Sequence, residues 1–368
     1  MLSGKELILS TKEYAREDIR SSWFHTLTTL GLLIVSLVGT LYVPFLAGRI
    51  ACSVFSGLLV IRFFIIYHDY QHHTILHNSK VAEVLMTIFG LYILAPASIW
   101  KRSHDYHHQH NSKLFSADIG SYPIVTKSQF KTMSRKERLM YLAIRHPLTI
   151  LFGYITMFIL GMCLRSFLSN PKKHMDSLLA LLIHIGGSVL IWMGFGFEGW
   201  LLFVFIPFLI GESLGAYLFY AQHNFPGVVF KDKAGWTFEG AALESSSFLK
   251  TNPVMAWFTG NIGYHHIHHL NHRIPFYRLP ETYRAIPELR TAKVTSLHPR
   301  EILRCLRLKV WCVQTQAMVG IRGLLPRAGA FLNCANSSGG KPCTCLFQSP
   351  SAFPTRARPA GTPDTFPR

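Results

Sequence analysis

Six apolar runs divide this chain of 368 residues into segments. They cover residues 23–46, 50–67, 81–97, 148–168, 178–194 and 200–220. A helix needs about 20 consecutive apolar residues to cross a bilayer, so the longer runs predict membrane-spanning helices. Pro44 and Gly48 are typical of a turn between the first two runs. The pattern therefore predicts an all-α integral membrane protein.

Histidines gather in three clusters beside these runs. The clusters occupy residues 68–73, 104–108 and 265–269, with the spacings HxxxHH, HxxHH and HxxHH. Residues three and four apart share one face of a helix, so each cluster can direct two or three imidazoles to one point. Imidazole is the commonest metal ligand in proteins, and a further histidine follows the last apolar run. The candidate metal ligands are His68, His72, His104, His107, His108, His223, His265, His268 and His269.

Other histidines carry less weight. His73 and His266 fall off the shared face of their clusters and are expected to contact ligands or solvent rather than metal. The same holds for His77, His110 and His272. Isolated histidines are usually solvated or hydrogen-bonded in a core, and this group comprises His25, His146, His174, His184 and His298.

Three polar residues beside the clusters have two alternative roles each. Asp69 and Asp105 follow the first histidine of their clusters, so each either accepts the second N–H of a ligand or is a solvated carboxylate. Asn261 either reaches the metal through water or serves as a cap or turn residue.

All clusters can serve one site only if they lie on the same side of the membrane. We therefore expect the run at 81–97 to be interfacial or re-entrant. Lys172 and Lys173 favour the cytoplasm for the next loop, whereas residues 194–198 contain no Lys or Arg. The run at 148–168 is then expected not to cross fully, and the last two runs to form a hairpin.

This arrangement gives about four transmembrane helices plus interfacial helices. The loop at 101–145, with nine Lys or Arg against three Asp or Glu, favours a cytoplasmic, histidine-rich cap. Residues 1–22 are expected to form a cytoplasmic N-terminal segment without a cleavable signal peptide, and 23–310 the membrane domain. Residues 322–368, rich in Pro, Ser, Gly and Arg, are expected to form a disordered tail.

The formal net charge of +18 raises the question of which negatively charged partners the protein binds. The basic residues flank apolar runs, which is typical of loops facing anionic lipid, and such a face also attracts an acidic redox partner. No nucleic-acid partner is expected. Seven cysteines without a CxxC pair argue against a disulfide framework or a zinc ribbon. Inside the runs, Arg62 is expected to reach the headgroups, while Glu212 pairs with Arg62, binds a substrate headgroup or has neither role.

The number of imidazoles narrows the choice of metal. A zinc hydrolase uses about three protein ligands, and no Glu-x-x-His pair of the soluble carboxylate di-iron type is present. Nine imidazoles indicate two iron ions (Fe2+/Fe3+) that activate O2. No catalytic side chain beyond this metal centre is expected.

Residues 50–310 resemble the integral-membrane fatty acid desaturase family. The resemblance rests on the three histidine boxes, on residues 222–223, on Asn-Ile-Gly-Tyr at 261–264 and on Ile-Pro-Phe-Tyr-Arg-Leu-Pro at 274–280. It implies a di-iron centre held by the nine histidines, O2 as co-substrate, and a cis double bond introduced into a long acyl chain. The substrate would be a membrane lipid or an acyl thioester in an apolar tunnel. The chain lacks a His-Pro-Gly-Gly sequence, so the electron donor would be a separate ferredoxin or small cytochrome.

Other readings stay open. A related membrane hydroxylase or ketolase acting on a carotenoid, sterol or alkane uses the same boxes. A metal transporter would place its histidines in mid-bilayer on broken helices, whereas these histidines flank the apolar runs. An inactive scaffold would not need the intact boxes that this chain has. The position of the double bond, the acyl carrier, the donor and the oligomeric state are not determined by the sequence.

Overall fold

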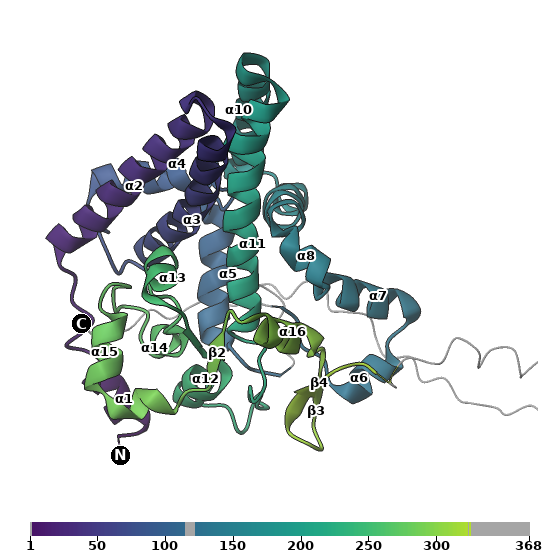
Figure 1. Cartoon of the computed structure of the whole chain (residues 1–368). Coiled ribbons are helices and arrows are strands. Elements are labelled where there is room, and N and C mark those ends of the chain that lie inside the picture. Colours follow the sequence, from purple (N-terminus) through teal and green to yellow (C-terminus); the bar gives the residue numbers. More distant parts are fainter. Residues whose placement is uncertain (1, 115–121, 323, 325–368) are drawn as a thin grey trace, which may run out of the picture. The chain divides into compact units, whose positions relative to one another are not determined.

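A computed structural model describes residues 2–114, 122–322 and 324, which form a mostly helical unit (Figure 1). The predicted tail at 322–368 lies almost wholly outside these residues, so its disorder stays a prediction.

The first two apolar runs form a pair of antiparallel helices. Helix α2 spans Ile19–Tyr42 and α3 spans Leu46–Gln71. Asp18 caps α2 by accepting hydrogen bonds from the N–H groups of Arg20 and Ser21. The helix ends before Pro44, because proline disfavours helical backbone at the preceding residue. The two predicted runs are thus confirmed as helices, and α3 extends to the first histidine cluster.

Helix α11, Ile206–Ala221, packs closely against α3. A Cβ atom added at Gly57 would lie 2.7 Å from Cβ of Ile210, and one at Gly211 would lie 2.8 Å from Cγ1 of Val60. Small residues at both positions let the two backbones approach, as is common between apolar helices. This contact brings the C-terminal ends of α3 and α11, which precede candidate ligands, toward one place.

The last two apolar runs fold back on each other at Gly196. Helix α10 spans Met175–Trp200 and is followed by η2, Leu201–Phe205, but Gly196 inside α10 has φ 68° and ψ −172°. The rings of Trp192 and Trp200 lie 5.6 Å apart, and those of His184 and Phe208 lie 4.8 Å apart. Because each pair is centred on Gly196, the chain reverses there. The predicted hairpin, with its turn at 194–198, is confirmed.

The shorter apolar runs form bent or brief helices. Helix α4, Lys80–Tyr92, meets α5, Ala97–His110, at 92°, as expected of a re-entrant segment or a broken span. The run at 148–168 becomes α8, Pro147–Leu151, a π-helix η1, Tyr154–Leu164, and α9, Arg165–Ser169. The apolar helix Tyr154–Ser169 is shorter than a full span, in line with the prediction.

Three helical stretches in the described part of the chain are long and apolar enough to cross a membrane. They are α2, α3 and Met175–Ala221, with a fourth if the bent pair α4–α5 counts as one span. These helices are candidate membrane spans, as a membrane protein requires, and the number of spans stays a prediction. The stretch Met175–Ala221 is the hairpin at Gly196.

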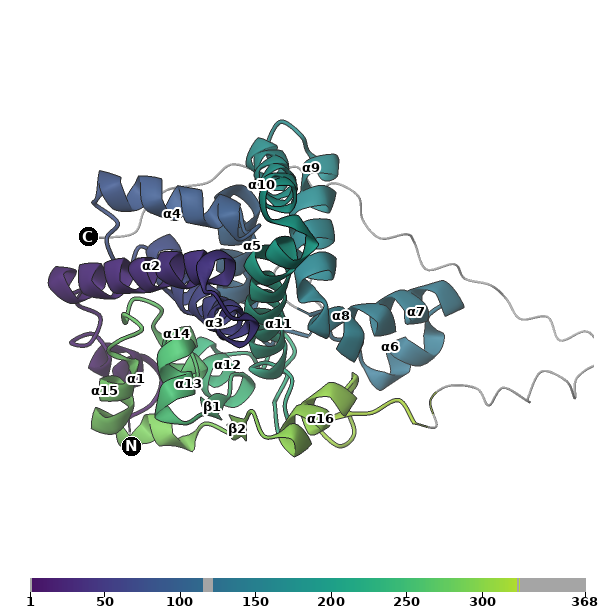
Figure 2. The same ribbon diagram turned by 45° about the horizontal axis from the view of Figure 1, so that its top comes forward.

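The remaining elements are short. They are α1 (Gly4–Ser10), α6 (Lys127–Thr132), α7 (Arg135–Ile144), α12 (Phe238–Ser245), β1 (Phe248–Lys250), α13 (Pro253–Phe258), α14 (His265–Leu270), α15 (Leu279–Ala285), η3 (Pro287–Thr291), β2 (Val294–Ser296), α16 (Pro299–Arg307), β3 (Val310–Cys312) and β4 (Ala317–Val319). Helices α12 to α15 gather in one region in both views (Figure 1, Figure 2). Strands β1 and β2 pair in parallel, and β3 and β4 antiparallel. These two small sheets are the exception to the all-α prediction, since strands of three residues leave no alternating pattern.

The prediction that Arg62 reaches the headgroups is wrong. Its side chain is buried among α2, α3 and α13, with its Cζ atom 3.8 Å from the ring centre of Trp257. Its Nε donates to Oγ1 of Thr29 at 3.1 Å, Nη1 donates to the carbonyl of Trp257, and Nη2 lies 3.3 Å from Nδ1 of His25. Packing and hydrogen bonds hold the guanidinium inside. Among the described residues it forms no ion pair with Glu212, which is also buried.

Candidate metal centre

The structure brings all nine candidate histidines into two groups. The first group is His68, His72, His104, His108 and His268, and the second is His107, His223, His265 and His269. Within each group, one ring nitrogen per residue lies within 4.8 Å of all the others. Residues from four separate parts of the chain therefore meet at two points, as two metal ions would require.

Four helices position these side chains. His68 lies in the last turn of α3, and His72 is the residue after its end. His223 stands two residues beyond the end of α11. Helices α5 and α14 supply the other six and divide them between the groups. The i, i+3, i+4 spacing produces this division, because three side chains on one face fan out toward two neighbouring points.

The Nε2 atoms face one another at close range. In the first group, Nε2 of His104 lies 2.9 Å from that of His68 and 3.1 Å from that of His108. The Nε2 atoms of His108 and His268 are 3.0 Å apart. A ring nitrogen offers one hydrogen or one lone pair, so neutral rings cannot satisfy such a run of contacts. Nitrogens about 2.1 Å from a common ion and at right angles to each other would be about 3.0 Å apart, which fits a shared cation.

The second group repeats this arrangement. Nε2 of His223 lies 3.0 Å from Nε2 of His107 and 2.8 Å from Nε2 of His265. The Nε2 atoms of His265 and His269 are 3.1 Å apart. Four imidazoles at these distances leave the same conflict of lone pairs, which a bound cation would resolve. The donor set of both groups thus fits metal ions.

Burial keeps these rings in the form that binds metal. Removal from water, followed by the influence of neighbouring histidines, lowers the pKa values of His265, His268 and His269 well below the usual range. Burial also lowers the pKa of His223 to about 4. The neutral imidazole is the metal-binding form, so the site needs no deprotonation step at neutral pH.

Two rings are oriented by hydrogen bonds to their Nδ1 atoms. Nδ1 of His68 lies 3.1 Å from Oδ1 of Asp69, whose Oδ2 accepts the N–H of Phe276 at 2.7 Å. Nδ1 of His223 lies 3.1 Å from the carbonyl oxygen of Ser245. With the hydrogen on Nδ1, each ring presents the lone pair of Nε2 to its group. Of the two roles considered for Asp69, the contacts favour the one that orients a ligand.

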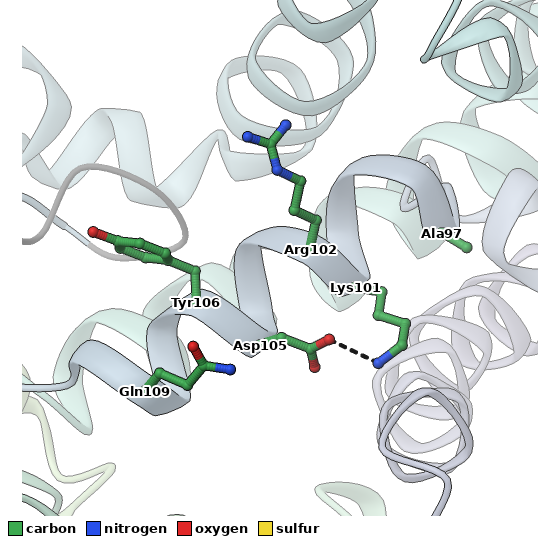
Figure 3. A pocket seen from close by; sticks show the side chains of 6 residues that line it. All are labelled: Ala97, Lys101, Arg102, Asp105, Tyr106 and Gln109. Carbon is green, nitrogen blue, oxygen red and sulfur yellow. Dashed lines mark hydrogen bonds and ion pairs between the residues drawn. The ribbon is translucent and has the colours of Figure 1, made fainter. Parts of the chain in front are cut away.

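Asp105 takes the other role. Its carboxylate pairs with Lys101 at 2.8 Å on the outer face of α5, where it is 40% exposed (Figure 3). This face also carries Arg102 and Gln109 and lines an open hollow of about 430 Å³ (Figure 3). Both aspartates directly follow the first histidine of their clusters, but Asp69 is buried inside the protein whereas Asp105 lies on the surface.

The remaining cluster histidines lie outside both groups. His73 and His77 are exposed, and the ring of His110 stacks on Tyr106. His266, on α14, is buried with its ring centre 6.0 Å from those of Phe248 and Tyr283, and the ring of His272 stacks on His72 with 4.8 Å between centres.

Asn261 has φ 55° and donates its Nδ2 to the carbonyl of Phe276 at 3.2 Å, which is the behaviour of a turn residue.

The isolated histidines have structural contacts, as expected. His146 and His298 cap α8 and α16, and His25 contacts Arg62. His174 and His184 lie at hydrogen-bond distance from Ser98 and Tyr154.

Sequence reasoning missed Arg145, which is fully buried and donates to Oδ1 of Asn224, the neighbour of His223. Arg145 stands in a basic stretch of sequence, where arginines are usually exposed, so the sequence does not mark it as buried. The only sequence feature that points to this contact is the position of Asn224 directly after the candidate ligand His223.

Long apolar helices that end at two groups of imidazoles able to hold metal ions are the features of a membrane metalloprotein. The chain belongs to the fatty acid desaturase family, because the sequence model of that family matches residues 20–300. It is accordingly an oxidoreductase of the desaturase class.

Curated relatives agree with this assignment. A "Fatty acid desaturase" of Bacillus subtilis (strain 168) is 28% identical over 325 residues, covering 87% of this chain and 91% of the relative. An "sn-1 oleoyl-lipid 12-desaturase" of Synechocystis sp. (strain ATCC 27184 / PCC 6803 / Kazusa) is 24% identical over 280 residues, covering 75% and 79%. A chloroplastic "Omega-6 fatty acid desaturase" of Spinacia oleracea is 23% identical, covering 63% and 52%.

Proposed function

We propose that this protein is an O2-dependent desaturase that introduces a cis double bond into a long acyl chain at a di-iron centre. The observation that carries the proposal is the convergence of one ring nitrogen from each of nine histidines in two groups. In this proposal the first group holds one iron ion and the second group holds the other. Imidazole suits iron, and a site without carboxylate ligands leaves the ions cationic.

The overall reaction converts one acyl CH2–CH2 unit to CH=CH. It consumes O2, two electrons and two protons, and it releases two molecules of water. When bound, the iron ions supply the oxidising chemistry that removes hydrogen from an unactivated methylene, which no side chain can do.

The chain's own residues hold the site in place. Asp69 keeps the hydrogen of His68 on Nδ1, and the Ser245 carbonyl does the same for His223. Eight of the nine rings are buried, which keeps water away from them.

The substrate proposed is an acyl chain bound in a membrane lipid. Two relatives are named for action on an oleoyl lipid, and the apolar helices, as candidate membrane spans, support a location in the same bilayer as such a substrate. The acyl chain would enter from the bilayer through an apolar tunnel beneath the histidines. That tunnel and the position of the double bond stay predictions.

The histidine groups are proposed to face the cytoplasm, with four membrane-spanning segments. The excess of Lys and Arg at 101–145 supports this orientation. A separate carrier, a ferredoxin or a small cytochrome, would supply the electrons one at a time. The outer face of α5, drawn in Figure 3, belongs to the same helix as His104, His107 and His108, so it offers a route for electrons through a single helix.

The test is fatty-acid profiling of a desaturase-deficient host that expresses this chain. A double variant, His268→Ala with His269→Ala, removes one histidine from each group. The matched control, His73→Ala with His77→Ala, removes two exposed histidines from another cluster region. We expect a new unsaturated acyl species with the wild type and the control but not with the first variant. Unchanged acyl lipids, despite two bound iron ions per chain, would refute the acyl-desaturase proposal.

A further inference from the structure

Helix α7 exposes a row of large apolar side chains in the part of the chain that the structure describes. Leu139, Met140 and Ile144 are 59%, 57% and 41% exposed. Intervals of one and four residues place them on one side of the helix. Single exposed apolar residues are normal, but several large ones together mark a surface that an apolar partner covers.

This row continues beyond α7 into the apolar run at 148–168. Leu148 and Leu151, both on α8, are more than half exposed. Phe152 and Ile155 follow and are also exposed. The open side of α7 is therefore continuous with an apolar segment of the predicted membrane domain.

The opposite side of α7 packs on protein. Tyr141 is buried, its ring centre lies 5.9 Å from that of Phe130 on α6, and its hydroxyl donates to the carbonyl of Lys309. A helix on the surface of a soluble domain directs its polar side outward. Because α7 directs leucine, methionine and isoleucine outward instead, its open side is suited to apolar surroundings.

Contacts with α11 place the C-terminal end of α7 at the end of a candidate membrane span. Arg145, directly after α7, donates to Oδ1 of Asn224 at 2.6 Å, three residues beyond the end of α11. Six residues further along the chain, the carbonyl of Leu151 accepts from Oγ of Ser213, inside α11. Since α11 completes the candidate span Met175–Ala221, α7 begins to project from the bundle at the level where that span ends (Figure 1, Figure 2).

The segment around α7 is also strongly basic. Residues 122–145 contain six Lys or Arg and one acidic residue, Glu137, whose carboxylate accepts the N–H of Ser134. Arg135 and Lys136, in the first turn of α7, are exposed beside the apolar row, as is Lys131 on α6. Apolar residues flanked by cations are typical of helices that lie in the interface of an anionic membrane.

We propose that α7 lies in the headgroup layer and binds anionic phospholipid. Leu139, Met140 and Ile144 contact the acyl chains, while Arg135 and Lys136 contact the phosphates. An acidic protein could pair with the cations, but the continuity of the apolar row with the run at 148–168 favours lipid. The proposal needs neither a metal ion nor turnover, so it can fail or stand independently of the proposed function.

The test uses the full chain in nanodiscs that contain equal amounts of phosphatidylglycerol and phosphatidylcholine. The photo-crosslinking amino acid p-benzoylphenylalanine replaces Met140, and in a second protein it replaces Leu139, in case one of the two does not fold. The matched control replaces Gln314, which is exposed in the turn between β3 and β4, on the side of α7 that packs on protein. After illumination, mass spectrometry should find lipid adducts at positions 139 and 140 and none at 314.

Charge variants test the preference for anionic lipid. Arg135→Gln with Lys136→Gln removes two exposed cations of α7, and the control, Lys231→Gln with Lys233→Gln, removes two exposed lysines of the loop after α11. Each Lys or Arg near an anionic surface contributes about fivefold to binding. Phosphatidylglycerol should therefore exceed phosphatidylcholine about fivefold or more among the adducts at position 140. The first pair should remove most of this excess, and the control pair should leave it unchanged.

Other occupants of this surface would give different products. Cross-links from positions 139 and 140 to residues 325–368 or to a second copy of the chain, in place of lipid, would overturn the proposal. So would the absence of lipid adducts together with binding of a plant-type ferredoxin that the first pair abolishes, which would assign the surface to an acidic protein. Equal adducts of the two lipids, unchanged by the first pair, would overturn the assignment of the cations to anionic lipid.

Discussion

Replacing Asp69 by Asn should weaken metal binding in the first group without moving a helix. Asp69 accepts two hydrogen bonds, from Nδ1 of His68 at 3.1 Å and from the N–H of Phe276 at 2.7 Å. Asparagine has the same shape but one acceptor oxygen, so one of the two donors would face its NH2 group. Loss of a partner of this kind lowers metal affinity about 10–100-fold, or about 1.4–2.8 kcal/mol.

The control is Asp105→Asn. Asp105 also follows the first histidine of a cluster, but its carboxylate pairs with Lys101 in solvent. Exposed ion pairs contribute about 0–1 kcal/mol, so its loss should change metal affinity less than about fivefold.

The assay is iron per chain after dialysis of the purified proteins against graded chelator concentrations. We expect Asp69→Asn to release iron from one group at 10–100-fold lower chelator than the wild type, and Asp105→Asn to follow the wild type. Equal behaviour of the two variants would refute the assignment of Asp69 as the residue that orients His68. Thermal unfolding of the metal-free proteins shows whether a change arises from folding instead, since the N–H of Phe276 also depends on Asp69.

Three more outcomes are expected. Arg62→Met should lower the free energy of unfolding by about 3 kcal/mol, because buried acceptors lose their donor. The control Arg49→Met removes a partly exposed ion pair and should lower the free energy of unfolding by less than about 1 kcal/mol. Denaturation in detergent measures both. Gly211→Ala should cost about 1–3 kcal/mol where a Cβ meets Val60, and Gly186→Ala, with open space around it, should cost nothing or stabilise; equal melting temperatures would contradict this. The metal-free protein should lose stability as pH falls from about 6.5 toward 4. The pKa of His223 is lowered to about 4 in the folded protein, so in that window the histidine binds a proton only in the unfolded protein. An unchanged free energy of unfolding between pH 7.5 and 5.5 would contradict a neutral His223 in the folded protein.

The candidate metal ligands and the turn at 194–198 were predictable because each depends on a short stretch of sequence. The spacing of the histidine boxes depends only on helical geometry, and all nine candidates do meet in space. The turn at 194–198 was visible from its glycines and its lack of Lys and Arg, and Gly196 adopts the left-handed conformation there.

Contacts between distant segments were not predictable. Arg62 looked like a residue that reaches the headgroups because it stands near a helix end, yet Trp257, from α13, covers it. The different roles of Asp69 and Asp105 depend on Phe276 and Lys101, which nothing in the box motif specifies. One sequence cannot show which polar groups a buried site will bring together.

Helices α5 and α14 each contribute histidines to both groups, with His104 and His108 on one side and His107 on the other in α5. A metal ion bound at either group would therefore order the helix that carries the ligands of its neighbour. We expect filling of one site to raise the affinity of the other, because the entropy of fixing α5 and α14 is lost only once. Titration with limiting iron should then yield a mixture of empty and fully loaded chains, with few chains that carry a single ion.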